Sequence, residues 1–367
     1  MTSETLALNI GNTYQQIRDG SNNKSSFFTY PDVLRVRGSV LFNILPQVTF
    51  MMLFAALNAY IYDKYKYSIG LPNTIIPSLS VVIGMLLVFR TNNAYDRYYE
   101  GRKLWTTIKS SVRNLSRTIS SIPVENQQDV HQKVDALKLL IAYIISLKDY
   151  LRDESDKNHQ LIDDILPPRL KSDKFNAIEF DAERNKYLSS YGALSRSISS
   201  TSSSSYRSVP DLTNPLASLP LEIATELNAY TYNQKALNRT DGPTNNAINT
   251  TINSLVDTLG GLERIRRTPI PIAYVIHMKQ VVFLYCATLP FTLSNFGYWS
   301  IGFTGLISFV LYGIDGIGQQ IEDPFGYDDN DLPLDQICFE LRKEMEFTIS
   351  KVLEPERYGF DKYSFNS

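Results

Sequence analysis

A stretch rich in carboxylates follows a long uncharged run near the carboxyl end of the chain. The stretch reads IGQQIEDPFGYDDNDLPLD, from Ile317 to Asp335, and it places six Asp and Glu residues around a Pro-Phe-Gly turn. Carboxylates at this density could bind calcium, cap the next helix in solvent, or form part of a gate at a membrane surface. The segments on either side of this stretch are needed to choose among these three roles.

The order of residues in this stretch excludes an EF-hand calcium loop. Such a loop has ligands at alternating positions, a central glycine and a glutamate at its end. The segment DDNDLPLDQICFE has no glycine and places two leucines around a proline. Capping remains open, because Asp331 or Asp335 would cap a helix that contains Cys338–Ile349, with Pro333 near its first turn.

The composition argues against several classes of protein. The chain has 367 residues, a formal net charge of −2 and 43% hydrophobic residues, whereas nucleic-acid-binding proteins usually carry a strong basic excess. Its two cysteines, Cys286 and Cys338, cannot form a disulfide framework or a metal-type Cys/His spacing. The first residues lack a basic segment followed by an apolar one, so no signal peptide is expected. We find no Gly-rich phosphate loop or nucleophile elbow, and an enzyme is not expected.

The elements that position the acidic stretch are blocks of uncharged sequence. Residues 40–62 and 67–89 each contain 23 positions without a charge, and residues 280–314 contain 35. A helix needs roughly 20 apolar residues to cross a bilayer. With the apolar residues upstream of the third block, and a turn at its centre, we predict two further spans at about 269–291 and 297–314. A soluble protein with buried core helices is the alternative, but four such blocks are hard to bury.

A long polar region between the second and third spans reads as mostly helical. Val134, Leu137, Ile141, Ile144 and Ile145 recur at helical spacing, which predicts one buried face. The uncharged centre of that helix, LLIAYIISL, is too short to span. Further helices are predicted from Leu221 to Leu237 and from Ala247 to Leu259, the latter closed by Gly260-Gly261. No strand pattern is evident, so the predicted fold is all-α.

We therefore expect an all-α membrane protein with four transmembrane helices and a large cytosolic helical domain. Residues 189–208 contain 11 serines and are expected to form a loop that could be phosphorylated. The predicted segments are an amino-terminal part (1–34), a first hairpin (35–90), the cytosolic region (91–267), a second hairpin (268–316), a post-membrane motif and helix (317–354) and a tail (355–367). Four spans place both termini on one side. The basic residues after the second span agree with that side being cytosolic: Arg90, Arg97, Arg102, Lys103, Lys109 and Arg113.

The end of the second span carries a dense group of polar and aromatic residues. It reads FRTNNAYDRYYEGRKLW, and an anchor at the membrane interface would by itself explain Arg90, Tyr95, Tyr98 and Tyr99. Such an anchor would not require so many spaced charges. This segment resembles the signature that follows the second helix in the bestrophin family, in its bacterial, fungal and plant branches. Three further segments resemble that family in the expected order: VRGSVLFNILP, ERIRRTPIPIAYVIHMKQ and IEDPFGYDDNDLPLD.

The resemblance implies a homopentameric ion channel with one pore on the five-fold axis. Its neck would be lined by apolar side chains of the second helix, at Val81, Met85 and Phe89, which lie roughly on one helix face. A gap near Gly84 would make the set Pro77, Val81 and Met85 instead. The signature residues carried over after the neck are Arg90, Asn92, Asn93, Tyr95, Asp96 and Arg97. A narrow apolar ring resists wetting, but it does not by itself choose between anions and cations.

What the resemblance implies about function is a channel for chloride and other small anions, in the plasma membrane or an internal membrane. Its expected partners are copies of itself, inorganic anions and lipid, and no nucleic acid. A cation-selective channel of the same architecture and a non-conducting membrane scaffold or regulator are the rivals. In animal bestrophins the acidic stretch is a calcium clasp. Carried over, it would use the side chains of Asp328 and Asp331 and the carbonyls of Gln320 and Asp323, although Tyr327 and Asn330 interrupt the animal pattern.

Overall fold

The computed structural model describes residues 38–65, 75–152, 166 and 219–354, and all regular elements within them are helices. The Ser-rich stretch 189–208, the segment 1–34 and the tail 355–367 lie outside the described residues. The described helices are α2 (Leu41–Tyr65), α3 (Ile75–Ser121), α4 (Gln127–Arg152), α7 (Leu219–Ala236), α8 (Gly242–Arg267), α9 (Ile272–Thr292), the 3₁₀ turn η5 (Ser294–Phe296), α10 (Trp299–Glu322) and α11 (Leu334–Leu353).

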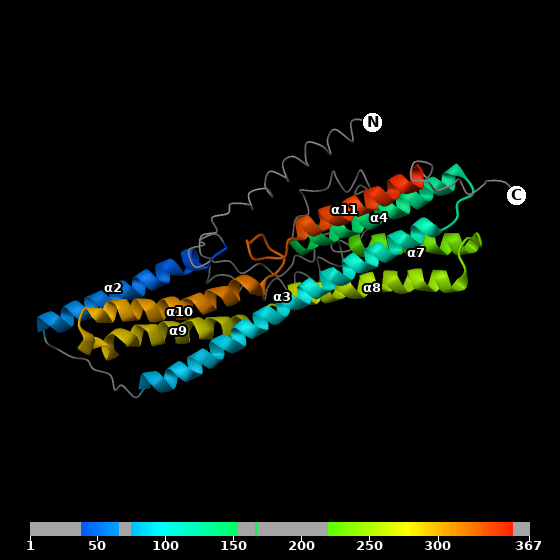
Figure 1. Ribbon diagram of the computed structural model, residues 1–367. Coiled ribbons are helices and arrows are strands. Elements are labelled where there is room, and N and C mark those ends of the chain that lie inside the picture. Colours follow the sequence, from blue (N-terminus) through cyan, green and yellow to red (C-terminus); the bar gives the residue numbers. More distant parts are fainter. Residues whose placement is uncertain (1–37, 66–74, 153–165, 167–218, 355–367) are drawn as a thin grey trace, which may run out of the picture.

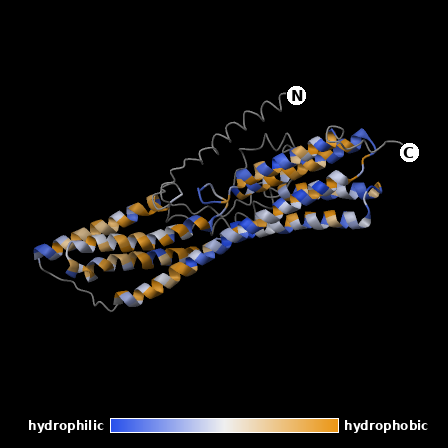
Figure 2. Ribbon diagram, in the orientation of Figure 1, coloured by the Kyte–Doolittle hydropathy of each residue, from blue (hydrophilic) through white to orange (hydrophobic). Residues whose placement is uncertain are grey.

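The helices run along one long axis and divide the molecule into two halves (Figure 1). One half, the spanning half, contains α2, α9, α10 and the beginning of α3, all of which are long and apolar enough to cross a membrane. The other, the extramembrane half, contains α4, α7, α8, α11 and the end of α3. Hydropathy follows the same division, with apolar residues dominating the spanning half (Figure 2). The four predicted spans are thus all found as helices.

Helix α3 belongs to both halves. It runs for 47 residues without a break, which at a rise of about 1.5 Å per residue gives a length of about 70 Å. A boundary between a membrane hairpin and a cytosolic region drawn at residues 90 and 91 therefore falls inside this helix. The polar signature contains several weak helix formers but no proline, so no residue in it forces the helix to end. The spanning and extramembrane parts of α3 are consequently one continuous helix.

Helix α4 forms the centre of the extramembrane half, between α7 and α11. Val134, Leu137, Ile141 and Ile144 are buried as the spacing predicts, but Tyr143 and Leu147 on other faces are buried too. The hydroxyl of Tyr143 donates a hydrogen bond of 2.8 Å to the backbone carbonyl of Leu255 in α8. Helix α4 is covered on nearly all sides by protein. Its uncharged centre is therefore buried inside the extramembrane half and need not be long enough to span a membrane.

Helix α8 does not end at Gly260-Gly261, as the sequence suggested. It continues to Arg267, where Pro269 and Pro271 follow, and these residues cannot extend a helix. A Cβ added to Gly261 would lie 3.0 Å from Leu104 Cδ1. Glycine at this position therefore allows α8 to approach α3 closely rather than ending the helix.

The second membrane hairpin turns at Gly297, whose φ of 57° lies in the left-handed region that glycine tolerates. The fourth span extends eight residues beyond its predicted end at residue 314 and finishes at Glu322. Its extension includes Asp315, a charge that would normally mark the end of an apolar run. On its packed face, Gly305 allows close approach to α2, because an added Cβ would lie 3.0 Å from Met52 Cγ.

Candidate functional site

The apolar residues predicted for a pore neck lie on an outward face of α3. Val81, Met85 and Phe89 are 71%, 60% and 51% exposed within the single chain. On the opposite face, Ile83 and Leu87 are buried against the other spans. Pro77, the alternative third member, is also exposed. The helix thus presents a one-sided apolar stripe that this chain does not cover.

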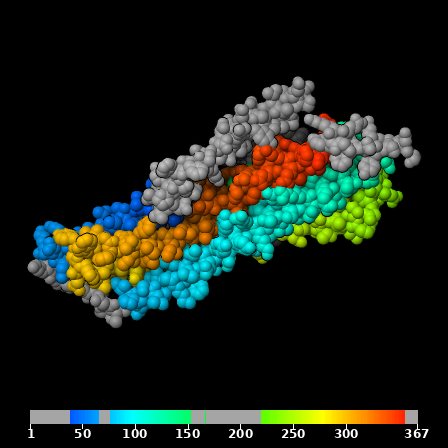
Figure 3. All heavy atoms as spheres, viewed as in Figure 1, coloured from blue at the N-terminus to red at the C-terminus, as the bar shows by residue number. Residues whose placement is uncertain are grey.

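Among the four spans, α3 is the least covered by its own chain. In its most apolar window 17% of the residues are buried, against 28% in α2, 33% in α9 and 28% in α10. In the space-filling view α3 forms one edge of the molecule along much of its length (Figure 3). A span at the edge, with an apolar stripe pointing away from the bundle, is suited to facing an axis shared with other copies.

The first residue of the signature, Arg90, points away from this stripe. Its guanidinium forms a buried ion pair with Asp315 of α10, and the two side chains are 1% and 9% exposed. A charged pair in a spanning bundle is costly unless its partners meet inside the protein. Arg90 therefore joins α3 to α10 directly behind the predicted neck. Asp315 was missed at the sequence level because it stands alone after an uncharged run.

Arg97 of α3 binds the ends of two other helices, α8 and α10. Its Nε donates to the backbone carbonyl of Glu322 at the end of α10 at 3.1 Å, and one Nη donates to the carbonyl of Ile265 at 2.6 Å. The other Nη donates to the carbonyl of Thr268, just after α8. Carbonyls at helix ends lack intrahelical partners, and a cation there also complements the helix dipole. Arg97 consequently fixes where the polar part of α3 meets the ends of α8 and α10.

The remaining signature residues stay on the outside of α3. Asn92, Asn93, Tyr95 and Asp96 are exposed, and the ring of Tyr95 stacks on that of Tyr99, with centroids 6.2 Å apart. These polar residues follow Phe89 along the helix, toward the extramembrane half. The outward face of α3 therefore changes from apolar to polar directly after the predicted neck.

The acidic loop after α10 packs directly on α3. Phe325 is fully buried, and a Cβ added to Gly101 would lie 3.2 Å from its ring. From the other side, Arg152 Nε donates to the Phe325 carbonyl at 3.2 Å, and its guanidinium lies 4.2 Å from the Tyr327 ring centroid. Arg152 also pairs with Asp335 at 2.6 Å. The loop is thus held between α4 and the helix that carries the predicted neck.

Neither acidic residue caps α11 in the way the sequence suggested. The residue before the helix is Pro333, and no side-chain hydrogen bond caps its amides. Asp335 lies inside the first turn and accepts hydrogen bonds from Lys148 and Arg152. Asp331 instead accepts a hydrogen bond of 2.8 Å from the Asp328 amide, closing its own loop. Both carboxylates are used for tertiary contacts, which the local spacing could not reveal.

The residues predicted for a calcium clasp meet only some requirements of a cation site. Gln320, Asp323 and Asp328 line one groove, whereas Asp331 faces into the loop. One oxygen of Asp331 is buried without a hydrogen-bond partner among the described residues, and burial, with Asp328 and Asp323 nearby, raises the pKa of Asp331 to about 6. Such a carboxyl attracts a proton or a cation. However, within the described ranges no group of three His, Cys, Asp or Glu side chains could hold a metal ion.

Comparison with known proteins decides the family. A family profile described as "Bacterial/Fungal Bestrophin protein" matches residues 21–347. The chain belongs to this bestrophin family. It is also 38% identical over 318 residues to a "voltage-dependent anion channel-forming protein" of Synechocystis, covering 86% of this chain and 89% of the relative. A Nostoc protein with the same description is 36% identical over 315 residues, covering 85% and 89%.

Solved structures support the fold of this bestrophin. A bacterial bestrophin homologue from Klebsiella pneumoniae matches with a TM-score of 0.64 and 23% identity, over 84% of this chain and 99% of that one. A second structure of that homologue matches with a TM-score of 0.64 and 22% identity, over 85% and 99%. The resemblance noted in the sequence is thereby confirmed. The chain is an integral, multi-pass membrane protein with four helices able to span a bilayer.

Proposed function

We propose that this bestrophin forms a channel that conducts chloride and other small anions. Its relatives in Synechocystis and Nostoc are described as anion channel-forming proteins, and membership in this family favours a channel over an enzyme. The observation that carries a pore is the outward stripe of α3, where Val81, Met85 and Phe89 remain uncovered on the least buried span, whereas the choice of anions rests on the relatives.

In the proposed channel five copies surround an axis, and the stripe of each α3 faces it. A ring of apolar side chains at that point would be narrow and difficult to wet, so a small change in radius would open or close conduction. Beyond Phe89 the same face becomes polar, and α3 continues into the extramembrane half as the wall of a vestibule. Arg90 and Arg97 hold α3 from behind, which would fix the radius of the ring.

The acidic loop supplies a route by which a ligand could influence the proposed neck. The loop contacts α3 at Gly101, about 12 residues along the helix from Phe89. Calcium, if bound, would be held by Asp328 and Asp331 with the carbonyls of Gln320 and Asp323, and it would supply positive charge to a loop rich in carboxylates. Calcium binding remains a prediction for this chain.

The decisive experiment is the reversal potential of purified protein in a planar bilayer across a potassium chloride gradient. We expect a shift toward the chloride equilibrium potential. A shift toward potassium would retain the architecture and favour the cation-selective rival. Absence of current, from protein shown by mass measurement to be a pentamer, would favour the non-conducting scaffold.

A further inference from the structure

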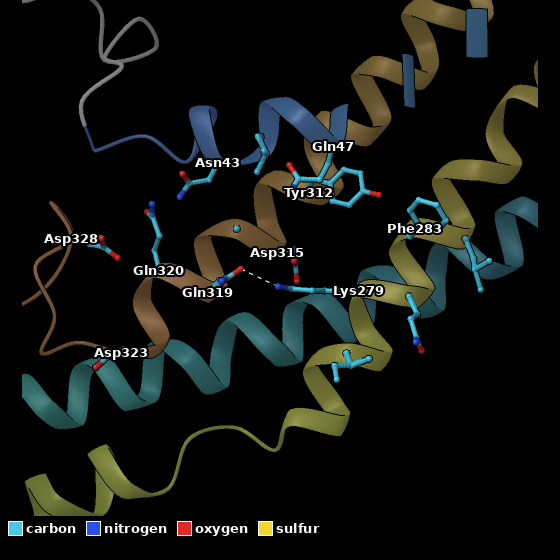
Figure 4. Close-up of a pocket in the computed structure, with 15 residues that line it drawn as sticks. Asn43, Gln47, Lys279, Phe283, Tyr312, Asp315, Gln319, Gln320, Asp323 and Asp328 are labelled. Atoms are coloured by element: carbon cyan, nitrogen blue, oxygen red, sulfur yellow. Dashed lines mark hydrogen bonds between the residues drawn. The ribbon is translucent and has the colours of Figure 1, made fainter. Parts of the chain in front are cut away.

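A groove of about 1390 Å³ opens between α2, α9 and α10, and it is separate from the stripe on α3 (Figure 4). Deeper in the spanning half α2 and α9 are joined, because the rings of Phe54 and Phe291 lie 5.8 Å apart and Asn58 Nδ2 donates to the Pro290 carbonyl at 2.8 Å. The groove occupies the end nearer the extramembrane helices. There the face of α10 that carries Tyr312 and Gln319 lines it.

The lining of the groove changes from apolar to charged along the membrane axis. At the deep end, α9 contributes Phe283 and Leu284. One turn nearer the extramembrane half it contributes Lys279, whose ammonium donates to Gln319 Oε1 at 3.3 Å. At the outer end lie the carboxylates of Asp323 and Asp328. A phospholipid of the adjacent leaflet has the same order, with acyl chains deep and the headgroup outermost.

Lys279 places a positive charge within the helix of the third span. It is the eighth residue of α9, so its Cα lies about 10 Å along the helix from Ile272. On α10, Asp315 is already paired with Arg90, and Glu322 acts on Lys279 electrostatically without forming an ion pair with it. No residue in the described ranges forms an ion pair with Lys279 within 4.0 Å. A lysine inside a span normally finds an anion or reaches the interface, and here the groove provides room for an anion.

We propose that the groove binds a zwitterionic phospholipid with a primary-amine headgroup. The phosphate contacts Lys279, an acyl chain lies along Phe283 and Leu284, and the ammonium points to Asp323 and Asp328. An anionic lipid without the amine would meet the same lysine but would be repelled by the two carboxylates. Amide side chains between the charges, such as Asn43, can donate to the ester oxygens (Figure 4). This site is independent of whether the chain conducts ions.

Native mass spectrometry of the delipidated full-length protein tests the proposal. The protein is titrated, with a calcium chelator present, with dioleoyl phosphatidylethanolamine, dioleoyl phosphatidylglycerol or inorganic phosphate. We expect the ethanolamine lipid to be retained best. Lys279→Gln should reduce its retention about tenfold at subsaturating lipid, the scale of one charge-assisted hydrogen bond, and Lys279→Arg should retain it. Asp323→Asn with Asp328→Asn should abolish the preference for ethanolamine over glycerol.

Lys64→Gln is the matched control, because it removes one lysine from the other end of the spans, at the last turn of α2. It should bind the lipid as the unmodified protein does. Each variant must elute as the same oligomer, so that misfolding is distinguished from lost binding. Equal lipid retention by Lys279→Gln overturns the site. Equal or better retention of the glycerol lipid overturns the zwitterionic assignment. Displacement of lipid by millimolar phosphate would indicate a free-anion site and overturn the lipid assignment.

Discussion

Arg90 of α3 and Asp315 of α10 form an ion pair whose side chains are 1% and 9% exposed. Removing one partner leaves a buried charge uncompensated, which costs about 3–5 kcal/mol. We therefore expect Asp315→Asn and Arg90→Met each to lower the thermal stability of the oligomer sharply. Size-exclusion chromatography after heating measures the fraction that stays folded.

The double variant Arg90→Met with Asp315→Leu should recover most of that stability, since an apolar pair can replace a buried ion pair. The control is Lys109→Met, which removes the partly exposed pair with Glu340 and should cost less than about 1 kcal/mol. A double variant as unstable as the single ones would show that the two charges are not coupled.

Arg97 is expected to be difficult to replace even by lysine. Its planar guanidinium donates hydrogen bonds to the carbonyls of Ile265, Thr268 and Glu322 at once. The ammonium of a lysine cannot reproduce that geometry. We expect Arg97→Lys to destabilise the protein by about 1–3 kcal/mol and Arg97→Ala by more. Thermal unfolding of the purified protein measures both effects.

Arg102→Lys is the matched control, because Arg102 is an exposed arginine on the same helix. It should leave the midpoint of unfolding unchanged. Equal effects of the two lysine substitutions would show that the hydrogen bonds of Arg97 contribute little to joining the helix ends.

The contact between α3 and α11 should weaken in acid. Arg113 Nε donates to Glu344 Oε2 at 2.6 Å, and this hydrogen bond lowers the pKa of Glu344 below its usual 4.5. Because the pKa of Glu344 is lower in the folded protein than in the unfolded chain, its ionised form stabilises the fold fully above about pH 4.5. This stabilisation is lost as the pH falls through the pKa of Glu344 in the folded protein. The side chains are partly exposed, so the contribution is below about 1 kcal/mol.

We therefore expect Glu344→Gln to lower the unfolding midpoint slightly at neutral pH and to have no effect once Glu344 is protonated. Glu346→Gln is the control, since among the described residues the ion pair of Glu346 is with Arg342, within α11 itself. A difference between Glu344→Gln and the unmodified protein that persists in strong acid would contradict the linkage.

The four spans were predictable because each is a local property of its sequence, an uncharged run of sufficient length. The continuity of α3 and the far end of α10 were not. In both helices charged residues, Arg90 and Asp315, follow an apolar run and look like the end of a span. They pair with each other across a long separation in sequence, so both charges are compensated inside the protein, which the local sequence could not show.

The candidate site shows the same limit. The stripe of Val81, Met85 and Phe89 follows from helical spacing, but only the family resemblance suggested which face of the helix matters. Gly101 and Arg152 carried no local signal, because their roles depend on Phe325 arriving from a distant loop. Lys279 was likewise invisible, since its significance comes from a groove built by three helices.

Calcium removal tests the predicted clasp. We expect calcium to raise the unfolding temperature of the chelator-treated protein, because a ligand bound only to the folded state stabilises it. Asp331→Asn should remove that increase, since it removes the buried carboxylate oxygen that has no hydrogen-bond partner among the described residues. Asp329→Asn is the control, because Asp329 lies in the same loop but is not one of the predicted calcium ligands. An equal calcium response in Asp331→Asn would exclude this carboxylate as a ligand.

The neck assignment makes the most direct prediction about conduction. Val81→Ala with Met85→Ala should change gating or unit conductance without dissociating the oligomer, because it widens an apolar ring while leaving the packed face of α3 intact. Single-channel recording in a planar bilayer measures the change.

The matched control for the neck is Leu53→Ala with Leu57→Ala, which removes two exposed apolar side chains at the same spacing from α2. If those residues face lipid, their loss alters apolar surface by a comparable amount but leaves the ion pathway untouched. Currents should then resemble those of the unmodified protein. Unchanged currents in the α3 double variant, from protein of normal oligomeric size, would show that Val81 and Met85 do not line the neck. Equal changes in both double variants would point to a general effect of spanning-helix packing.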